Sequence, residues 1–338
     1  MSRTILLDHI GEVEVAALMD NGVLIDLLFD TTAPRPGTIY RAIADRPVKG
    51  QGGMFLKTPD GAAFLRAAKG FAPGQPLFVQ VSGYAEQGKA IPVTQKLLFK
   101  SRYAIVTPDA PGLNISRAVK DEDIRDRLLE VAHEEMAGSL MGLILRSDAA
   151  QADPGEVADD IGAMRSLAEQ VMNDSGTGPE TLSEGDGPHV LAWREWTAPA
   201  EVVTAQGCFR AFDVLEAIDA ARGAEVPLKP GVMFVEPTRA LVAVDVNTGA
   251  DTSPAAGLKA NIAAARALPA ALRVRGLGGQ IVLDLAPMPK KDRRTFEQTL
   301  RAALRADDVE TTLVGWTPLG HMELQRKRAR APLTELPQ

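Results

Sequence analysis

Two short apolar segments, each carrying an aspartate near its end and separated by a predicted helix, constrain the fold most strongly. They are residues 241–247 (Leu-Val-Ala-Val-Asp-Val-Asn) and 281–285 (Ile-Val-Leu-Asp-Leu). Continuous apolar runs of this length are typical of strands that are buried on both faces of a sheet. The stretch between them predicts a helix over residues 258–273, with Pro269 as a kink or break. A strand–helix–strand connection makes the strands parallel, so Asp245 and Asp284 should meet at one edge of the sheet.

Asp245, Asp284 and Asn247 form a candidate metal site at that edge. Open α/β sheets bind ligands at the C-terminal ends of their strands, and Asn247 shares a face with Asp245 because it follows two residues later. Two carboxylates and an amide oxygen are hard ligands that suit Mg²⁺. Such an ion lowers the pKa of bound water and offsets charge that builds on a phosphodiester. In the alternative interpretation each aspartate only caps the loop or helix that follows, and these residues alone leave both interpretations open.

The rest of the chain predicts an α/β protein (α+β overall) with an inserted barrel. Residues 37–100 are rich in glycine and in short strand-like segments, which suits a small barrel such as an OB-fold. Further strands are predicted at 5–7, 13–18, 23–28, 103–106, 142–145, 232–235 and 311–315, and Asp20-Asn21-Gly22 predicts the turn between the second and third of them. Helices are predicted at 122–136, 153–173 and 293–305, with Asp153 as N-cap and Pro154 as first residue of the second helix, and residues 174–188 predict a loop.

The charge is unevenly distributed along the chain. The net charge is −7, but residues 148–187 hold ten acidic residues and one basic residue, whereas residues 259–330 hold fourteen basic and seven acidic residues. The basic region can attract phosphates, or it can be a set of solvated helix faces. The single cysteine, Cys208, excludes disulfides within the chain and cysteine-paired zinc sites. Neither a signal peptide nor an apolar run of about 20 residues is found, so we expect a cytoplasmic protein without a membrane partner.

Several motifs in the C-terminal third resemble those of the RNase E/G family of ribonucleases. Residues 244–248 (Val-Asp-Val-Asn-Thr) resemble the family's Asp-Ile-Asn-Ser motif. Residues 261–279, which end Leu-Arg-Val-Arg-Gly-Leu-Gly-Gly, resemble its Asn-Leu-Glu-Ala-Ala…Leu-Arg-Asp-Leu-Gly-Gly stretch, and residues 281–284 and 319–328 continue the match. The resemblance is therefore dense from Leu241 to Arg328.

The resemblance implies a DNase-I-like catalytic subdomain over residues 241–330. In it, Asp245 and Asp284 would be the Mg²⁺ ligands, and Asn247 would position one of these carboxylates or the attacking water. The family often has a further acid three residues after the second aspartate, where this chain has Pro287. Larger members also carry a Cys-x-x-Cys zinc link after this region, and this chain has no such pair. The expectation is therefore a monomer or a dimer that is not linked by zinc.

The resemblance also implies RNA contacts in the barrel. Residues 37–41 (Gly-Thr-Ile-Tyr-Arg) resemble the start of the family's OB-fold RNA-binding domain. The positions that match its base-stacking aromatics are Phe55 and Phe64, and Lys89 would contact phosphates. Stacking on such rings is worth roughly 1–3 kcal/mol per base. In the alternative interpretation Phe55 and Phe64 are part of the barrel core.

A sensor for a five-prime monophosphate is implied at residues 143–147 (Leu-Ile-Leu-Arg-Ser), where Arg146 would form a charged fork and Ser147 would supply a hydroxyl. The alternative is an ion pair between Arg146 and the acidic helix that follows. Lys291 and Arg294, just after the second aspartate, are expected to contact RNA. Residues 326–330 (Arg-Lys-Arg-Ala-Arg) are either a solvated helix end or a further RNA contact.

Together these features predict six segments: N-terminal strands of an RNase H-like subdomain (1–36), the OB-fold (37–100), a sensor-like subdomain (101–187), an RNase H-like continuation (188–240), the DNase-I-like subdomain (241–330) and a tail (331–338). The predicted function is Mg²⁺-dependent endonucleolytic cleavage of single-stranded RNA. One alternative is a non-catalytic RNA-binding protein on the same scaffold. A more remote one is a metal-dependent phosphatase for small phosphoesters, which leaves the barrel unexplained.

Overall fold

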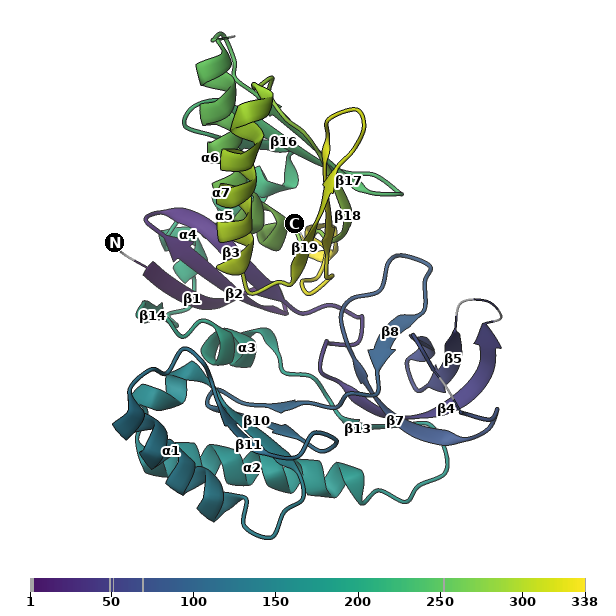
Figure 1. Cartoon of the computed structure of the whole chain (residues 1–338). Coiled ribbons are helices and arrows are strands. Elements are labelled where there is room, and N and C mark those ends of the chain that lie inside the picture. The colour runs from purple at the N-terminus through teal and green to yellow at the C-terminus, as the bar shows by residue number, and fades with distance from the viewer. Residues whose placement is uncertain (1–2, 49, 51, 69, 252, 338) are drawn as a thin grey trace. The chain divides into compact units, whose positions relative to one another are not determined.

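The computed structural model describes residues 3–48, 50, 52–68, 70–251 and 253–337 (Figure 1). The chain forms two compact units, one made of Met1–Thr31 with Pro199–Gln338 and the other of Thr32–Ala198. Both contain sheets and helices, so the mixed α/β class is confirmed. The finer names, RNase H-like and DNase-I-like, and the division into six segments stay predictions.

A closed five-stranded barrel occupies the first part of the second unit. Its strands are β4 (Ile39–Val48), β5 (Gly53–Thr58), β6 (Gly61–Leu65), β7 (Pro76–Val81) and β8 (Ile91–Thr94). They pair in the order β4-β5-β6-β8-β7, and β7 closes the barrel by pairing with β4. Tyr40, Leu56 and Val79 are among the fully buried side chains that fill it. The barrel is consistent with the OB-like fold predicted for residues 37–100.

The predicted loop at 174–188 is wrong in part, because β13 (Glu180–Ser183) pairs antiparallel with β4. Arg41 explains this pairing. Its side chain is almost fully buried, forms ion pairs with Asp174 and Glu180, and donates to the Gly178 carbonyl at 2.6 Å. Because a buried guanidinium needs such partners, the acidic segment is held against the barrel.

A second, four-stranded sheet completes this unit, in the order β11-β12-β10-β9. It consists of β9 (Phe99–Lys100), β10 (Ala104–Thr107), β11 (Leu113–Ile115) and β12 (Gly142–Leu145), with helices α1 (Glu122–Glu135), η1 (Ser147–Gln151), α2 (Pro154–Met172) and α3 (Pro188–Glu195). The predicted N-cap of α2 is confirmed, because the Asp153 carboxylate accepts a hydrogen bond from the Gly155 N–H at 2.8 Å.

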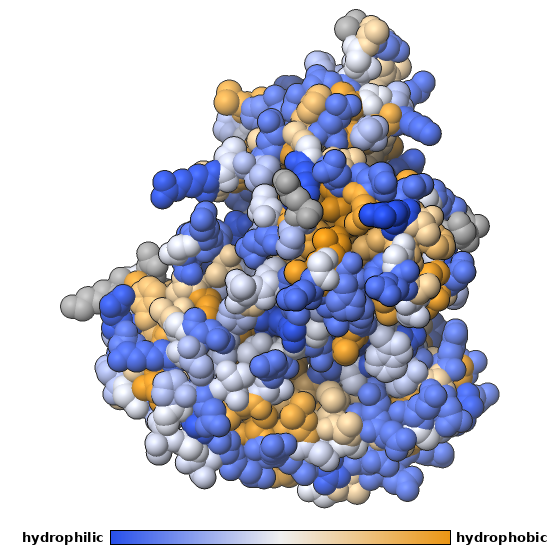
Figure 2. All heavy atoms as spheres, turned by 180° about the vertical axis from the view of Figure 1, so that it is seen from behind, coloured by the Kyte–Doolittle hydropathy of each residue, from blue (hydrophilic) through white to orange (hydrophobic). Residues whose placement is uncertain are grey.

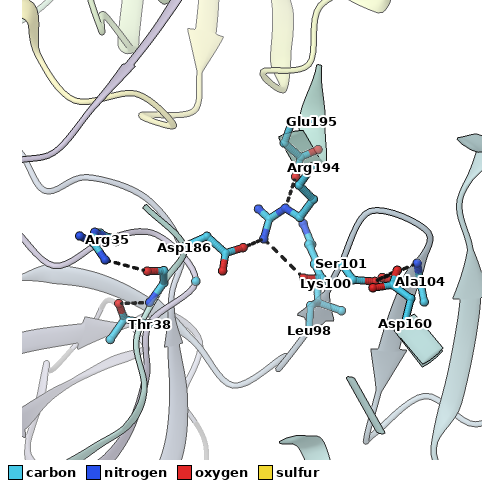
Figure 3. A network of polar contacts seen from close by, with 12 residues as sticks. Arg35, Thr38, Leu98, Lys100, Ser101, Ala104, Asp160, Asp186, Arg194 and Glu195 are labelled. Atoms are coloured by element: carbon cyan, nitrogen blue, oxygen red, sulfur yellow. Dashed lines mark hydrogen bonds and ion pairs between the residues drawn. The ribbon is translucent and has the colours of Figure 1, made fainter. Parts of the chain in front are cut away.

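Polar contacts connect the barrel with this second sheet inside the unit (Figure 3). The Gly185 N–H donates to Thr38 Oγ1 at 3.0 Å, and Arg35 Nη1 donates to the Gly185 carbonyl at 3.3 Å. The next residue, Asp186, forms an ion pair with Arg194 at the end of α3. The segment after β13 is therefore fixed at both ends.

The first unit begins with a sheet in the order β14-β1-β2-β3. Its strands are β1 (Arg3–Ile10), β2 (Val13–Asp20), β3 (Val23–Phe29) and β14 (Glu201–Val203), and short helices α4 (Cys208–Ala211) and α5 (Val214–Arg222) follow. The predicted turn between β2 and β3 is confirmed. Asn21 and Gly22 both have positive φ, 49° and 79°, which a two-residue hairpin of this kind requires.

A six-stranded mixed sheet forms the rest of this unit, in the order β15-β16-β17-β18-β20-β19. Its strands are β15 (Glu225–Pro227), β16 (Val232–Pro237), β17 (Val242–Asn247), β18 (Gly279–Asp284), β19 (Thr311–Trp316) and β20 (Met322–Arg326). Helices α6 (Pro254–Val274) and α7 (Arg293–Arg305) lie side by side on one face, and short turns η2 (Lys290–Asp292) and η3 (Leu333–Glu335) complete it (Figure 1). β17 and β18 are parallel, as the strand–helix–strand pattern predicted. Of the kink or break predicted at Pro269, the break is wrong, because α6 runs through this residue, and the kink stays a prediction.

Burial on both faces, predicted for β17 and β18, is also wrong. Val244 and Leu283 are buried in the core with Leu268 of α6 and Phe296 of α7. The side chains that alternate with them, such as Asp245 and Asp284, are exposed. The two helices cover one face of this sheet, and we call the opposite face the open face.

A buried charge network explains the basic run at 326–330. Arg326 lies in β20, not in a helix, and pairs with Asp307, whose side chain is fully buried. Arg330 donates to both carboxylate oxygens of Asp26 in β3, at 3.0 and 2.8 Å. Arg273 of α6 contacts both aspartates. The predicted RNA contact is therefore wrong for Arg326 and Arg330, because both guanidinium groups are buried in ion pairs. Arg330 and Arg273 connect β3 to the part of this unit that contains the six-stranded sheet.

None of the helices in the described part of the chain is long and apolar enough to cross a membrane. Seen from behind, the surface is largely hydrophilic with apolar side chains in patches (Figure 2).

Candidate active site

Asp245 and Asp284 are direct neighbours across the parallel strands β17 and β18. Both side chains point to the open face, because the residues before them, Val244 and Leu283, point into the core. Asn247 lies two residues further along β17, and its Nδ2 donates to Asp245 Oδ2 at 2.6 Å. The structure therefore brings together the three residues that the sequence placed at one sheet edge.

The two acids are accessible to solvent. Asp245 and Asn247 are exposed, and the side chain of Asp284 is 68% exposed. The burial on both faces that the sequence predicted for these strands therefore does not include the two carboxylates. Because this edge of the sheet is open, a phosphodiester and water can reach both carboxylates without any rearrangement of the core.

His321 is a neighbour of the acid pair that sequence reasoning did not single out. It lies just before β20, and its Nδ1 is 3.4 Å from Asp284 Oδ1 without hydrogen-bond alignment. This Nδ1 atom is buried and has no hydrogen-bond partner among the residues that the structure describes. Its backbone is held by Thr317: the Thr317 N–H donates to the His321 carbonyl at 2.8 Å, and the His321 N–H donates to Thr317 Oγ1 at 3.1 Å. The pairing of β18 with β20 brings His321 here, and no local pattern indicates it.

Asn261 fixes the chain directly after Asp284. This α6 side chain is fully buried, and its amide donates to the Ala286 carbonyl at 2.8 Å and accepts from the Ala286 N–H at 3.0 Å. Both backbone groups of Ala286 are therefore satisfied by one side chain. Helix α6 thus sets the end of β18, two residues beyond Asp284.

The donor set fits a magnesium ion. Asp245 and Asp284 offer hard carboxylate oxygens on one face, and the Asn247 amide orients the first of them. Among the described residues, no group of three or more His, Cys, Asp or Glu side chains could hold a metal together. Two protein carboxylates with water and substrate phosphate filling the remaining positions are typical of Mg²⁺ sites.

The two cations expected to contact RNA follow the acid pair in the chain. Lys291 lies in η2 and Arg294 in the first turn of α7, and both are exposed. Their neighbour Arg293 instead packs against an aromatic side chain, with its guanidinium 4.4 Å from the centre of the Trp316 ring. Lys291 and Arg294 are thus accessible to an anionic ligand.

Phe55 and Phe64 are a cross-strand pair on the outside of the barrel. They are opposite each other in β5 and β6, with ring centres 5.3 Å apart. The barrel core contains their neighbours along the two strands, so the alternative that both rings belong to this core is wrong. The Arg46 guanidinium lies 5.0 Å from the centre of the Phe55 ring. Gly53 leaves room for Phe64, since a Cβ atom at position 53 would approach the Phe64 ring to 2.3 Å. Lys89, in the loop between β7 and β8, pairs with Glu86 at 2.5 Å.

Arg146 forms an ion pair and a hydrogen bond with residues of its own unit. Its Nη2 pairs with Glu195 Oε2 at 2.6 Å, and its Nη1 donates to the Ser101 carbonyl at 2.8 Å. The predicted alternative partner was the acidic helix α2, whereas the observed partner is at the end of α3. Burial raises the pKa of Glu195, but Arg194 and Arg146 outweigh it and leave this pKa below its usual value. Ser147, next to Arg146, is at the start of η1.

The class of protein is indicated by a six-stranded mixed sheet with two in-register carboxylates on an open face, together with a small barrel that carries a partly exposed aromatic pair. Such features suit a protein that acts on nucleic acid. Comparison with known proteins identifies the group. The model of the Ribonuclease E/G family matches residues 99–197 and 194–329. The chain therefore belongs to the ribonuclease E/G family.

Several ribonucleases are similar to nearly the whole chain. Ribonuclease G of Escherichia coli (strain K12) is 29% identical, over 93% of this chain and 77% of that protein. Ribonuclease G of Haemophilus influenzae is 27% identical, over 94% of this chain and 78% of that protein. Ribonuclease E of Synechocystis sp. is 24% identical, over 96% of this chain and 56% of that protein. These relatives indicate ribonuclease function.

Proposed function

We propose that this protein is a magnesium-dependent endoribonuclease that cleaves single-stranded RNA at Asp245 and Asp284. The observation that carries the proposal is the register of β17 and β18, which sets the two carboxylates side by side on an open sheet face. Membership of a ribonuclease family supplies the substrate class. The metal, the mode of cleavage and the strandedness of the RNA go beyond what the relatives' names state.

Each side chain at the acid pair has its own proposed role. Asp245 and Asp284 would hold the ion, which when bound supplies a positive charge beside the phosphodiester and lowers the pKa of water. Asn247 keeps Asp245 in one orientation through its 2.6 Å hydrogen bond. Asn261 fixes the backbone that follows Asp284. Each contact reduces the reorganisation needed when the phosphodiester arrives, which is how positioned groups lower a barrier.

The barrel supports binding of unpaired RNA. Phe55 and Phe64 place two partly exposed rings on its outer surface, and bases that are not paired can stack on such rings whatever their identity. Arg46 beside Phe55 adds positive charge there. Lys89, Lys291 and Arg294 are proposed to contact phosphates, and such contacts make binding weaker as salt increases.

The decisive experiment measures cleavage and binding separately. Asp245→Asn and Asp284→Asn should each abolish Mg²⁺-dependent cleavage of a fluorescent single-stranded RNA, while anisotropy shows that the RNA still binds. The control is Glu310→Gln, which removes an exposed carboxylate elsewhere in the same unit and should leave cleavage unchanged. Cleavage by either aspartate variant at the wild-type rate would reject this active site.

A non-catalytic RNA-binding protein is the second candidate, favoured by one observation. The partly exposed aromatic pair of the barrel is separate from the acid pair, so RNA could bind there without being cleaved. Binding without any cleavage over a range of Mg²⁺ concentrations would support this candidate.

Sensing of a five-prime monophosphate is proposed at Arg146 and Ser147. Because Glu195 already pairs with Arg146, a terminal phosphate would have to replace this carboxylate. Glu195→Gln should therefore strengthen the preference for RNA with a five-prime monophosphate over a five-prime hydroxyl, and Arg146→Gln should remove it. Equal cleavage of both RNAs by the wild type would contradict the proposal.

A further inference from the structure

The open face beside the acid pair is rich in carboxylates. Besides Asp245 and Asp284 it includes Glu236 of β16 and Glu323 of β20, because the neighbours of these residues along each strand point into the core. Phosphates are repelled by such a face unless a cation is bound there. A contact with the uncharged base is not weakened by this repulsion, so it can add to the phosphate contacts proposed for Lys291 and Arg294.

Phe234 is placed to make such a contact. It is opposite Asp245 in the pairing of β16 with β17, so Phe234, Asp245 and Asp284 form one row across three strands. Its neighbours Met233 and Val235 are buried in the core, and Phe234 itself is partly exposed on the open face. An aromatic ring therefore lies next to the first of the two acids, on the side away from the second.

The spacing suits a nucleotide. Adjacent strands are about 4.8 Å apart, so the backbone of Phe234 lies roughly 10 Å from that of Asp284, with Asp245 between them. A phosphate held at the two aspartates leaves the base of an adjoining nucleotide within reach of the ring. Every base has a face that can stack on an aromatic ring, so this contact does not require a particular base.

From this arrangement we propose that Phe234 forms a nucleobase-stacking subsite that holds the nucleotide next to the scissile phosphate. The inference rests on the proposed ribonuclease function and extends it to a residue of β16. It adds a contact between the ring and a base to the phosphate contacts proposed for Lys291 and Arg294. Removal of the ring should therefore weaken binding without changing how strongly binding depends on salt, since no phosphate contact is lost.

The test is an abasic scan in a protein that does not cut. Asp284→Asn serves as the parent, and its affinity is measured by fluorescence anisotropy for short single-stranded RNAs that each lack one base. In this parent, the abasic position that faces Phe234 should cost roughly tenfold in affinity, as expected for a single stacking contact, whereas positions that stack on Phe55 or Phe64 should show losses of their own. In the double variant Asp284→Asn with Phe234→Ala, the intact RNA should bind about tenfold more weakly and the loss at that abasic position should disappear. Phe234→Trp should restore it.

Two control variants isolate the contribution of the Phe234 ring. Val314→Ala, which removes an exposed apolar side chain of edge strand β19, should change neither affinity nor the abasic scan. Lys291→Ala should reduce the salt dependence of binding, whereas Phe234→Ala should leave it unchanged. An identical abasic scan with and without the Phe234 ring, in a protein whose wild type cleaves RNA, would overturn the subsite alone. Absence of cleavage by the wild type would instead overturn the proposed function.

Discussion

Replacement of Asn261 by alanine tests how the core supports the acid pair. The Asn261 side chain satisfies both the N–H and the carbonyl of Ala286, in a place where it is fully buried. Each buried backbone group that loses its partner costs about 1–3 kcal/mol. With two groups affected, and some relief if water enters the space left by the side chain, Asn261→Ala should destabilise the protein by roughly 3 kcal/mol.

Calorimetry can measure this effect directly. The unit that contains Asn261 has roughly 170 residues, and for a domain of that size a loss of 3 kcal/mol lowers the melting temperature by about 6–12 °C. The control is Asn114→Ala, the same change at an exposed position of the other unit, which should stay within about 0.5 kcal/mol of the wild type.

Activity supplies a second readout for Asn261. Because Ala286 lies two residues beyond Asp284, the variant should lose cleavage rate at temperatures where it is fully folded, with little change in RNA affinity. A stability loss below about 1 kcal/mol would refute the hydrogen-bond argument, and an unchanged cleavage rate would refute the positioning argument.

Three further predictions concern other parts of the first unit. Asn247→Ala frees the Asp245 carboxylate from its hydrogen bond and should lower kcat about 10- to 100-fold with RNA affinity retained, as steady-state kinetics and anisotropy will show. Asp26→Asn leaves the buried Arg330 without its charge partner and should cost about 3–5 kcal/mol in urea unfolding; a loss under 1 kcal/mol would contradict this. Burial, with a smaller effect from a nearby carboxylate, raises the pKa of the Cys208 thiol from 9.0 to about 11, so it should stay protonated and fail to react with a thiol reagent at pH 8 until the protein unfolds.

Local patterns alone predict much of the fold. The alternation of apolar residues and the Asn21-Gly22 turn predict the hairpin of β2 and β3, and Asp153 followed by proline predicts the start of α2. These features depend on residues close together in the chain, whose geometry is dictated by backbone and side-chain preferences. Of the kink or break predicted at Pro269, the break does not occur, because packing of α6 against the sheet outweighs the loss of one backbone hydrogen bond.

The sequence by itself determined that Asp245 and Asp284 lie together at one edge of the sheet. Two strands joined by a helix must be parallel, so Asp245 and Asp284 reach the same edge without any knowledge of the rest of the chain. The neighbours of this pair were decided only by the tertiary structure. Phe234 and His321 reach it through strand pairings whose register is set by which side chains fill the shared core, and no local pattern records that choice. The exposure of the two carboxylates was also decided by the tertiary structure, since the helices cover only one face of the sheet and leave both carboxylates accessible to water.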